Sequence, residues 1–517
     1  MTQKPSFSTV AVWSTLLCVL LGIPWPDTAL AGGGPKGPRP GDPYLSIPLD
    51  RLGFDAIPQR LLIGGATMFT LHFVDDTHLL VTFNSRGLIP RINDGLPQED
   101  DRLITAVLVE LPTGNILART TWHTRDHEQY LWPLAHGMFL LRIRSRLTVI
   151  APLRNLGQAD AFREQIFLDM NHPIGYVSVS PGGDLLVVET VTPPRTQSES
   201  NASAGAPQVV QLQTKPNIEI RFYRMLYQTI GDEPPHLTAQ AAGIVSARNF
   251  IRVPATSEGF LDILQESNET WLFDFQSHAG KRLQLSPFDT SCAPSPYFVS
   301  RTEFVALGCR GSETHLMLSG FNLRGEQPWI QVLSGNQIAP MVVTAPDAGR
   351  FAFSRVLVAA SYYDIQNLVP EELSGQEIQV IQHYDGRILL KVMASPIQRT
   401  GQNFDLSENG LSFAVIRNGN LDVFHLPELS RKDAEQVKLA AALVEKNDAR
   451  IRLNPIRPTG TAKATPAPQT AESAITINAP TPEPEAPKAN AGDAQPSDGP
   501  RQAPSLYGPD YPKNPKL

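Results

Sequence analysis

Short apolar runs, each followed by turn-forming residues, are the feature that most constrains this chain. Residues 404–429 (FDLSENGLSFAVIRNGNLDVFHLPEL) show it best, because Ser-Glu-Asn-Gly and Arg-Asn-Gly-Asn separate three apolar runs. Asn-Gly supplies the positive φ that a tight hairpin turn requires. The stretch therefore predicts three short antiparallel strands, and similar runs recur along most of the chain.

Seven strand–turn–strand hairpins can be placed on the sequence. They span residues 71–83, 131–143, 177–188, 250–264, 297–309, 342–356 and 404–416. A second kind of hairpin, whose turn usually carries Gly, lies between several of them, at residues 108–118, 272–285, 318–330 and 380–392. Two alternating hairpins make a unit of four strands. When three long insertions are left out, residues 62–429 provide about 43 residues for each of seven units.

This period resembles that of the seven-bladed β-propeller superfamily, which includes the Trp-Asp repeat and YVTN-type propellers, since propeller blades recur every ~40–50 residues. The resemblance covers residues 44–429. It implies an all-β fold of seven four-stranded antiparallel blades arranged in a ring. An eight-bladed ring and two stacked β-domains remain alternatives.

The last unit has only three strands before Pro427, so its fourth strand must come from elsewhere in the chain. Residues 44–54 (YLSIPLDRLGF) are the natural donor. Their pairing with the last unit would close the ring and leave only short, protected strand edges.

The N-terminus has the pattern of a secretory signal peptide, residues 1–31. Lys4 is followed by an apolar run from Val10 to Ile23, and Ala29-Leu30-Ala31 offers small residues for cleavage after Ala31. An uncleaved membrane anchor is the alternative, although the run is short for a span of about 20 residues. We therefore expect a secreted or periplasmic protein with no stable membrane span after cleavage.

Three further segments flank the expected ring. Residues 32–43 read as a flexible Gly/Pro leader. Residues 430–448 predict a helix, because Ser430 and Asp433 have the spacing of a capping box. Residues 449–517 are rich in Pro and Ala and are predicted to be a disordered tail, since they offer little apolar surface to bury.

Two cysteines, Cys292 and Cys309, would remain after cleavage, and an exported protein meets an oxidising compartment. They flank a hairpin with a turn expected at Ser300-Arg301. A register in which paired residue numbers add to 601 places the two cysteines opposite each other, with Cα atoms about 4.5 Å apart. This spacing predicts a disulfide. Two buried free thiols are the alternative.

The charge balance argues against a nucleic-acid partner. The chain has 44 basic and 51 acidic residues, a formal net charge of −7, and the basic residues are scattered. A phosphate-binding surface needs clustered Lys and Arg. We expect a monomer without a cofactor.

Propeller geometry assigns each connection to one of two faces. The turns inside the hairpins lie on one face, here called the hairpin face. The loops from strand two to strand three, and from blade to blade, lie on the other, here called the insertion face. All three long insertions (residues 84–102, 191–217 and 356–377) are of the second kind. Because functional residues concentrate on loops held by a rigid scaffold, we expect the site on the insertion face and a bare hairpin face.

Several side chains are candidates for binding on the insertion face; none is assigned a catalytic role. Imidazoles and carboxylates on neighbouring blades could hold a divalent metal or transfer a proton, with ordinary loop hydrogen bonding as the alternative. They are His123, Asp126, His127, Asp169 and His172. An aromatic contact patch, or simple packing on the rim, is expected for Tyr362, Tyr363 and Asp364. A ligand clamp, or a solvated loop, is expected for Arg86 and Arg91.

No catalytic motif is present: the sequence lacks G-x-S-x-G, H-E-x-x-H, a Walker loop and paired C-x-x-C clusters. We expect a module that binds a protein or a glycan through the insertion face. The alternatives are a propeller enzyme of the lyase, lactonase or quinoprotein type with its site at the central channel, and a purely structural role in the cell envelope. Three or more carboxylates or imidazoles that converge on the channel mouth would favour the enzyme, whereas an apolar plug would favour binding.

Overall fold

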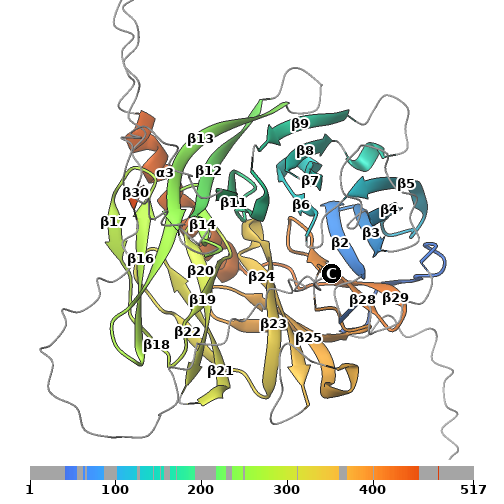
Figure 1. The fold of residues 1–517 in the computed structure, drawn as a ribbon. Coiled ribbons are helices and arrows are strands. Elements are labelled where there is room, and N and C mark those ends of the chain that lie inside the picture. Colours follow the sequence, from blue (N-terminus) through green and yellow to red (C-terminus); the bar gives the residue numbers. More distant parts are fainter. Residues whose placement is uncertain are drawn as a thin grey trace, which may run out of the picture. The chain divides into compact units, whose positions relative to one another are not determined.

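A computed structural model describes residues 41–54, 62–63, 67–86, 102–124, 129–143, 145–151, 153–156, 163–170, 172–192, 217–228, 236–247, 251–310, 312–359, 369–399, 401–452 and 475–476. Residues from 43 onward belong to one compact unit. Within it, seven small antiparallel sheets form a ring, which is a seven-bladed β-propeller (Figure 1). The structure thus confirms the expected fold and blade number.

The first three blades follow the chain in order, and the first strand of each lies nearest the axis. Blade 1 contains β2 (Thr67–Asp75), β3 (His78–Arg86), β4 (Arg102–Glu110) and β5 (Ile116–Thr124). Blade 2 contains β6 (Leu131–Pro133), β7 (Phe139–Ile143), β8 (Arg146–Ala151) and β9 (Arg163–Asp169). Blade 3 contains β10 (Ile174–Val179), β11 (Leu185–Thr192), β12 (Asn217–Gln228) and β13 (His236–Ala247), and β30 (Ile475–Thr476) pairs with β13.

The remaining blades repeat the pattern. Blade 4 contains β14 (Ala255–Thr256), β15 (Gly259–Gln265), β16 (Thr270–Ser277) and β17 (Arg282–Gln284), with β18 (Phe288–Asp289) also on β16. Blade 5 contains β19 (Ser295–Phe298), β20 (Glu303–Arg310), β21 (Ser312–Asn322) and β22 (Trp329–Val332). Blade 6 contains β23 (Asn336–Ala345), β24 (Arg350–Val358), β25 (Leu373–Gln382) and β26 (Arg387–Ala394). Blade 7 contains β27 (Phe404–Leu406), β28 (Ser412–Arg417) and β29 (Asn420–His425).

Short 3-10 helices interrupt several connections. They are η1 (Ala135–Gly137), η2 (Leu153–Asn155), η3 (Pro346–Ala348) and η4 (Pro370–Glu372). The structure has the two-residue turn that Asn-Gly predicts in blade 7. Arg417 pairs with Asn420 across Asn418 and Gly419, whose φ values are 51° and 75°. Two positive φ angles match the twist of the flanking strands, so the turn joins β28 and β29 without a bulge.

The N-terminal strand β1 (Leu45–Pro48) supplies the missing fourth strand of blade 7. It runs antiparallel to β29, with Leu45 opposite Val423 and Pro48 opposite Asn420. Four apolar side chains of residues 45–54 are at most 7 % exposed and share one core with blades 1 and 7: Ile47, Leu49, Leu52 and Phe54. The predicted closure of the ring is confirmed.

A second seam joins blades 1 and 7 near the axis. Alternate backbone amides of β2 donate hydrogen bonds of 2.7 Å to the segment that leads into β27. The pairs are Phe69 N to Gln398 Oε1, Leu71 N to Gln402 O, and Phe73 N to Asp405 Oδ2. The inner edge of β2 is therefore satisfied by another part of the chain.

The disulfide is confirmed, but the register used to predict it was wrong. Cys292 and Cys309 are bonded, with Cα atoms 5.4 Å apart. In β19 and β20 the paired residue numbers add to 602, as in Phe298 opposite Phe304, because the turn has three residues instead of two. Cys292 lies before β19, where the Ser291 amide donates to the Cys309 carbonyl at 3.0 Å and brings the sulfur atoms together.

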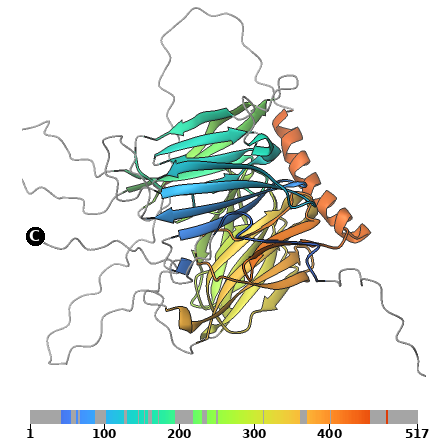
Figure 2. The same cartoon turned by 90° about the vertical axis from the view of Figure 1, so that its right-hand side faces the viewer.

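Helix α3 (Arg431–Arg452) corrects the expectation of a bare hairpin face, because it lies along that face (Figure 2). Its start has the expected capping box: Asp433 N donates to Ser430 Oγ, and Ser430 N donates to Asp433 Oδ2. Asp433 also pairs with Arg387 of blade 6 at 3.0 Å. The helix ends four residues beyond the expected boundary at 448.

The expected signal peptide and most of the leader and tail lie outside the described residues. Within the part of the chain that the structure describes, no helix has both the length and the apolar character needed to cross a bilayer.

Asp405, at the inner seam, is fully buried. Burial raises its pKa from 3.8 to about 8, although the amides of Phe73 and Leu406 donate to it and act in the opposite direction. The folded protein therefore keeps a proton on Asp405 at pH values where the unfolded chain has lost it. Consequently its contribution to the free energy of unfolding is largest below pH 4 and decreases as the pH rises to 8.

The Asp405→Asn substitution should remove this pH dependence, because Asn cannot ionise and its Oδ1 can still accept the Phe73 amide. We expect the difference in free energy of unfolding, variant minus wild type, to increase by up to about 1.4 kcal/mol for each pH unit between pH 4 and 8. Urea denaturation at pH 5 and pH 8 measures the difference. Wild type and variant share His72, whose pKa burial lowers to about 3, so its titration cancels. Parallel pH profiles would show that Asp405 is ionised in the fold.

Candidate functional site

Six of the ten predicted binding residues lie outside the described residues, and their roles stay predictions. They are Arg91, Asp126, His127, Tyr362, Tyr363 and Asp364. The three insertions do join second to third strands, in blades 1, 3 and 6, as their spacing predicted.

The other four predicted binding residues lie at the end of a strand or in the connection that follows it. Arg86 is the last residue of β3, opposite Arg102, and His123 lies in β5, opposite Leu103. Asp169 ends β9 and forms an ion pair of 3.0 Å with Arg146. His172 follows it in the connection to blade 3 and is partly exposed. Among the described residues, no three His, Cys, Asp or Glu side chains lie close enough to hold a metal ion together.

A cavity of about 490 Å³ opens instead on the hairpin face, where the first hairpins of blades 6, 7 and 1 turn near the axis. Asp76 belongs to the turn of blade 1, Asp347 to that of blade 6, and Glu408 to that of blade 7, while Glu428 follows β29. Asn409, Leu411 and Leu429 complete the lining. Four carboxylates thus surround a cavity with two leucines in its wall. We call it the acidic cavity.

The carboxylates of the acidic cavity repel one another. Burial raises the pKa of Glu408, and the charges of Asp347 and Asp76 raise it further, while His136 of blade 2 acts in the opposite direction. Because a cation inside the cavity would relieve this repulsion, the electrostatics favour a positively charged ligand.

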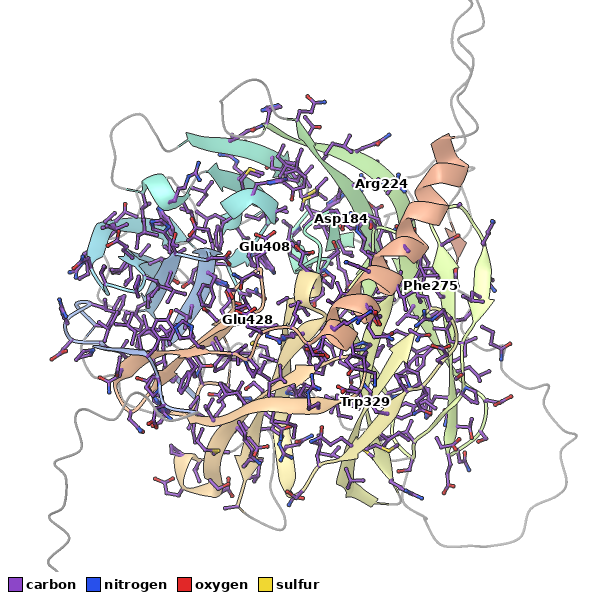
Figure 3. All side chains as sticks on the ribbon, turned by 180° about the vertical axis from the view of Figure 1, so that it is seen from behind. Asp184, Arg224, Phe275, Trp329, Glu408 and Glu428 are labelled. Atoms are coloured by element: carbon purple, nitrogen blue, oxygen red, sulfur yellow. A yellow bond between two sulfur atoms is a disulfide. The ribbon has the colours of Figure 1, made fainter. Side chains whose placement is uncertain are left out.

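Arg350, at the start of β24, holds two walls of the cavity in place. This side chain is 1 % exposed. Its guanidinium donates to the carbonyls of Gly410 at 2.6 Å and Pro427 at 2.7 Å, each within two residues of a cavity carboxylate. A buried donor with several fixed acceptors keeps these backbone segments rigid, so Glu408 and Glu428 stay in place. Figure 3 shows both residues near the middle of the ring.

An ion pair also joins two other first-hairpin turns of the hairpin face. Arg301 of the blade 5 turn reaches Asp184 of the blade 3 turn at 2.6 Å, although blade 4 lies between them in the ring. Asp184 is thereby neutralised, whereas the four carboxylates of the acidic cavity have no Lys or Arg among its lining residues. The Arg350 guanidinium offsets part of the charge of Glu428, so the uncompensated negative charge is concentrated on Asp76, Asp347 and Glu408.

Sequence reasoning missed the acidic cavity, although its residues lie in hairpins that were placed correctly. Asp76, Asp347 and Glu408 occupy the turns of three of the seven first hairpins. An alignment of those turns would have placed three acids at equivalent positions on one face. It could not have placed Glu428, which follows the last strand.

Comparison with known proteins supports no family assignment. No protein-family model matches the sequence, and no curated protein matches it.

Several solved structures align with parts of this chain at low identity. An acylaminoacyl peptidase from Pyrococcus horikoshii aligns with 76 % of this chain at 10 % identity and a TM-score of 0.39, and the match spans 55 % of the peptidase's length. A protein of unknown function from Desulfotomaculum acetoxidans aligns with 64 % of this chain at 10 % identity and a TM-score of 0.32, over 93 % of its own length. Hydrazine synthase from Kuenenia stuttgartiensis aligns with 75 % of this chain at 9 % identity and a TM-score of 0.27, over 83 % of its own length. At these values the comparisons carry no argument about activity.

Proposed function

We propose that this protein is an exported binding module that accepts a cationic side chain of a partner protein in the acidic cavity. The observation that carries the proposal is the lining of the cavity, which combines four carboxylates with Leu411 and Leu429. A Lys or Arg side chain has the matching chemistry, a charged end and an apolar stem. Among the described residues, no aromatic side chain lines the cavity for stacking on a sugar ring, so a protein partner is favoured over a glycan.

An enzyme with its site at the channel mouth is the second candidate, because the cavity has four carboxylates and three or more were expected of an enzyme. In that case Glu408, with its raised pKa, is the residue best suited to donate a proton. The arrangement favours binding, however. Among the described residues, no three such groups lie close enough to share a metal ion, whereas a bound cationic side chain needs only carboxylates spread around an opening.

The acidic cavity is tested by the double substitution Asp347→Asn and Glu408→Gln. We expect the affinity for a labelled hexa-arginine peptide at low salt to fall about tenfold, since two charge pairs of about 0.7 kcal/mol each are lost. Fluorescence anisotropy measures the affinity. The fold should persist, because the substitutions remove like-charge repulsion.

The matched control is Glu266→Gln with Glu269→Gln, which removes the same charge from the exposed β15–β16 connection on the insertion face. Its affinity should stay within twofold of the wild type. Equal losses in both double variants would mean that the peptide responds only to net charge, and the cavity would not be its site.

The proposal of export rests on residues 1–31 and is supported by the Cys292–Cys309 disulfide, which is typical of oxidising compartments. N-terminal sequencing of the protein recovered from its native host should begin at Gly32. A mature protein that begins at Met1 or Thr2 would contradict cleavage.

A further inference from the structure

The outer edge of blade 3 differs from the other outer edges of the ring. Its edge strand β13 has 12 residues and pairs with β12 from Gln228 opposite His236 to Ile218 opposite Ala247, with one register shift at Ala242 that divides the edge into two regular stretches, of which residues 243–247 are one. Such an edge presents a long row of backbone donors and acceptors to any extended chain.

The sequence of β13, HLTAQAAGIVSA, contains no Asp, Glu, Lys, Arg or Pro. Among the described outer strands, those longer than four residues each carry charge: Arg119 in β5, several charged residues in β9, and Arg387 and Lys391 in β26. The remaining ones, β1, β17 and β22, have at most four residues. Charge, proline and short length are the usual protection of an edge strand. Because β13 has none of these, we expect it to be covered.

The structure places a segment of the chain's own C-terminal region on this edge. Strand β30 runs parallel to β13, with Ile475 opposite Val245 and Thr476 opposite Ser246 (Figure 1). In the sequence from residue 453 to 517, Ile475, Thr476 and Ile477 are the only consecutive β-branched residues, and β-branched residues favour strands. The one part of this region suited to a strand is thus the part that pairs.

We propose that the edge of β13 is a strand-docking site whose occupant is the Ile475–Thr476 segment of the same chain. The 22 residues between α3 and β30 span at most about 75 Å when extended, so the segment is tethered close to its site. Tethering raises its effective concentration to about the millimolar range, at which a short pairing can persist. The pairing ties the C-terminal region to blade 3 and blocks this edge against strands of other molecules.

The test uses the full chain with Ile475→Pro, which removes one backbone donor and disfavours pairing. Ala489→Pro in the same C-terminal region is the matched control. Hydrogen–deuterium exchange should be about threefold or more faster at residues 244–247 in the Ile475→Pro variant, since one or two backbone hydrogen bonds protect them. Exchange in β28 should be unchanged in both variants, which shows that the ring is intact.

Three outcomes would overturn the proposal. The first is equal exchange at residues 244–247 in wild type and the Ile475→Pro variant. The second is an equal increase in the Ala489→Pro control. The third is protection in the wild type that disappears on dilution, because the occupant would then be the segment of a second molecule.

Discussion

The pairing of β1 with β29 is the interaction on which the rest of this structure depends. A ring of blades has two exposed ends unless its last sheet is completed, and here the first strand of the ring completes it. The segment buries four apolar side chains that contribute about 1.5–3 kcal/mol each, about 6–12 kcal/mol in all as an upper estimate. This is comparable to the total stability of about 5–15 kcal/mol of a typical domain.

Closure also creates the acidic cavity. Asp76 belongs to the first blade and Glu408 to the last, so they are neighbours only because blades 7 and 1 meet. The inner seam, where β2 donates to Gln402 and Asp405, sets these two blades side by side. Arg350 then ties blade 6 to the blade 7 turn and to the segment after β29. The same contacts that close the ring therefore hold four carboxylates around one opening.

Much of this fold could be predicted from local chemistry, because hairpin turns and apolar alternation act over a few residues. The Asn418-Gly419 turn, the Ser430–Asp433 cap and the closing strand are of this kind. The register of the Cys292–Cys309 hairpin was off by one because a three-residue turn cannot be told from a two-residue turn by composition. Aligned turns would have placed Asp76, Asp347 and Glu408 on one face, but not around one opening, because Asp76 lies 271 positions before Asp347 and the blades meet only when the ring closes.

The most direct test of the account is the stability of the full chain without residues 44–54, compared with a control that lacks only residues 32–40. In urea unfolding followed by tryptophan fluorescence, the first deletion should remove the cooperative transition or lower the free energy of unfolding by more than about 5 kcal/mol. Light scattering should show oligomers that form through the open edge of β29. The control should unfold like the wild type. An unchanged, monomeric unfolding transition after deletion of residues 44–54 would contradict closure by the N-terminal strand.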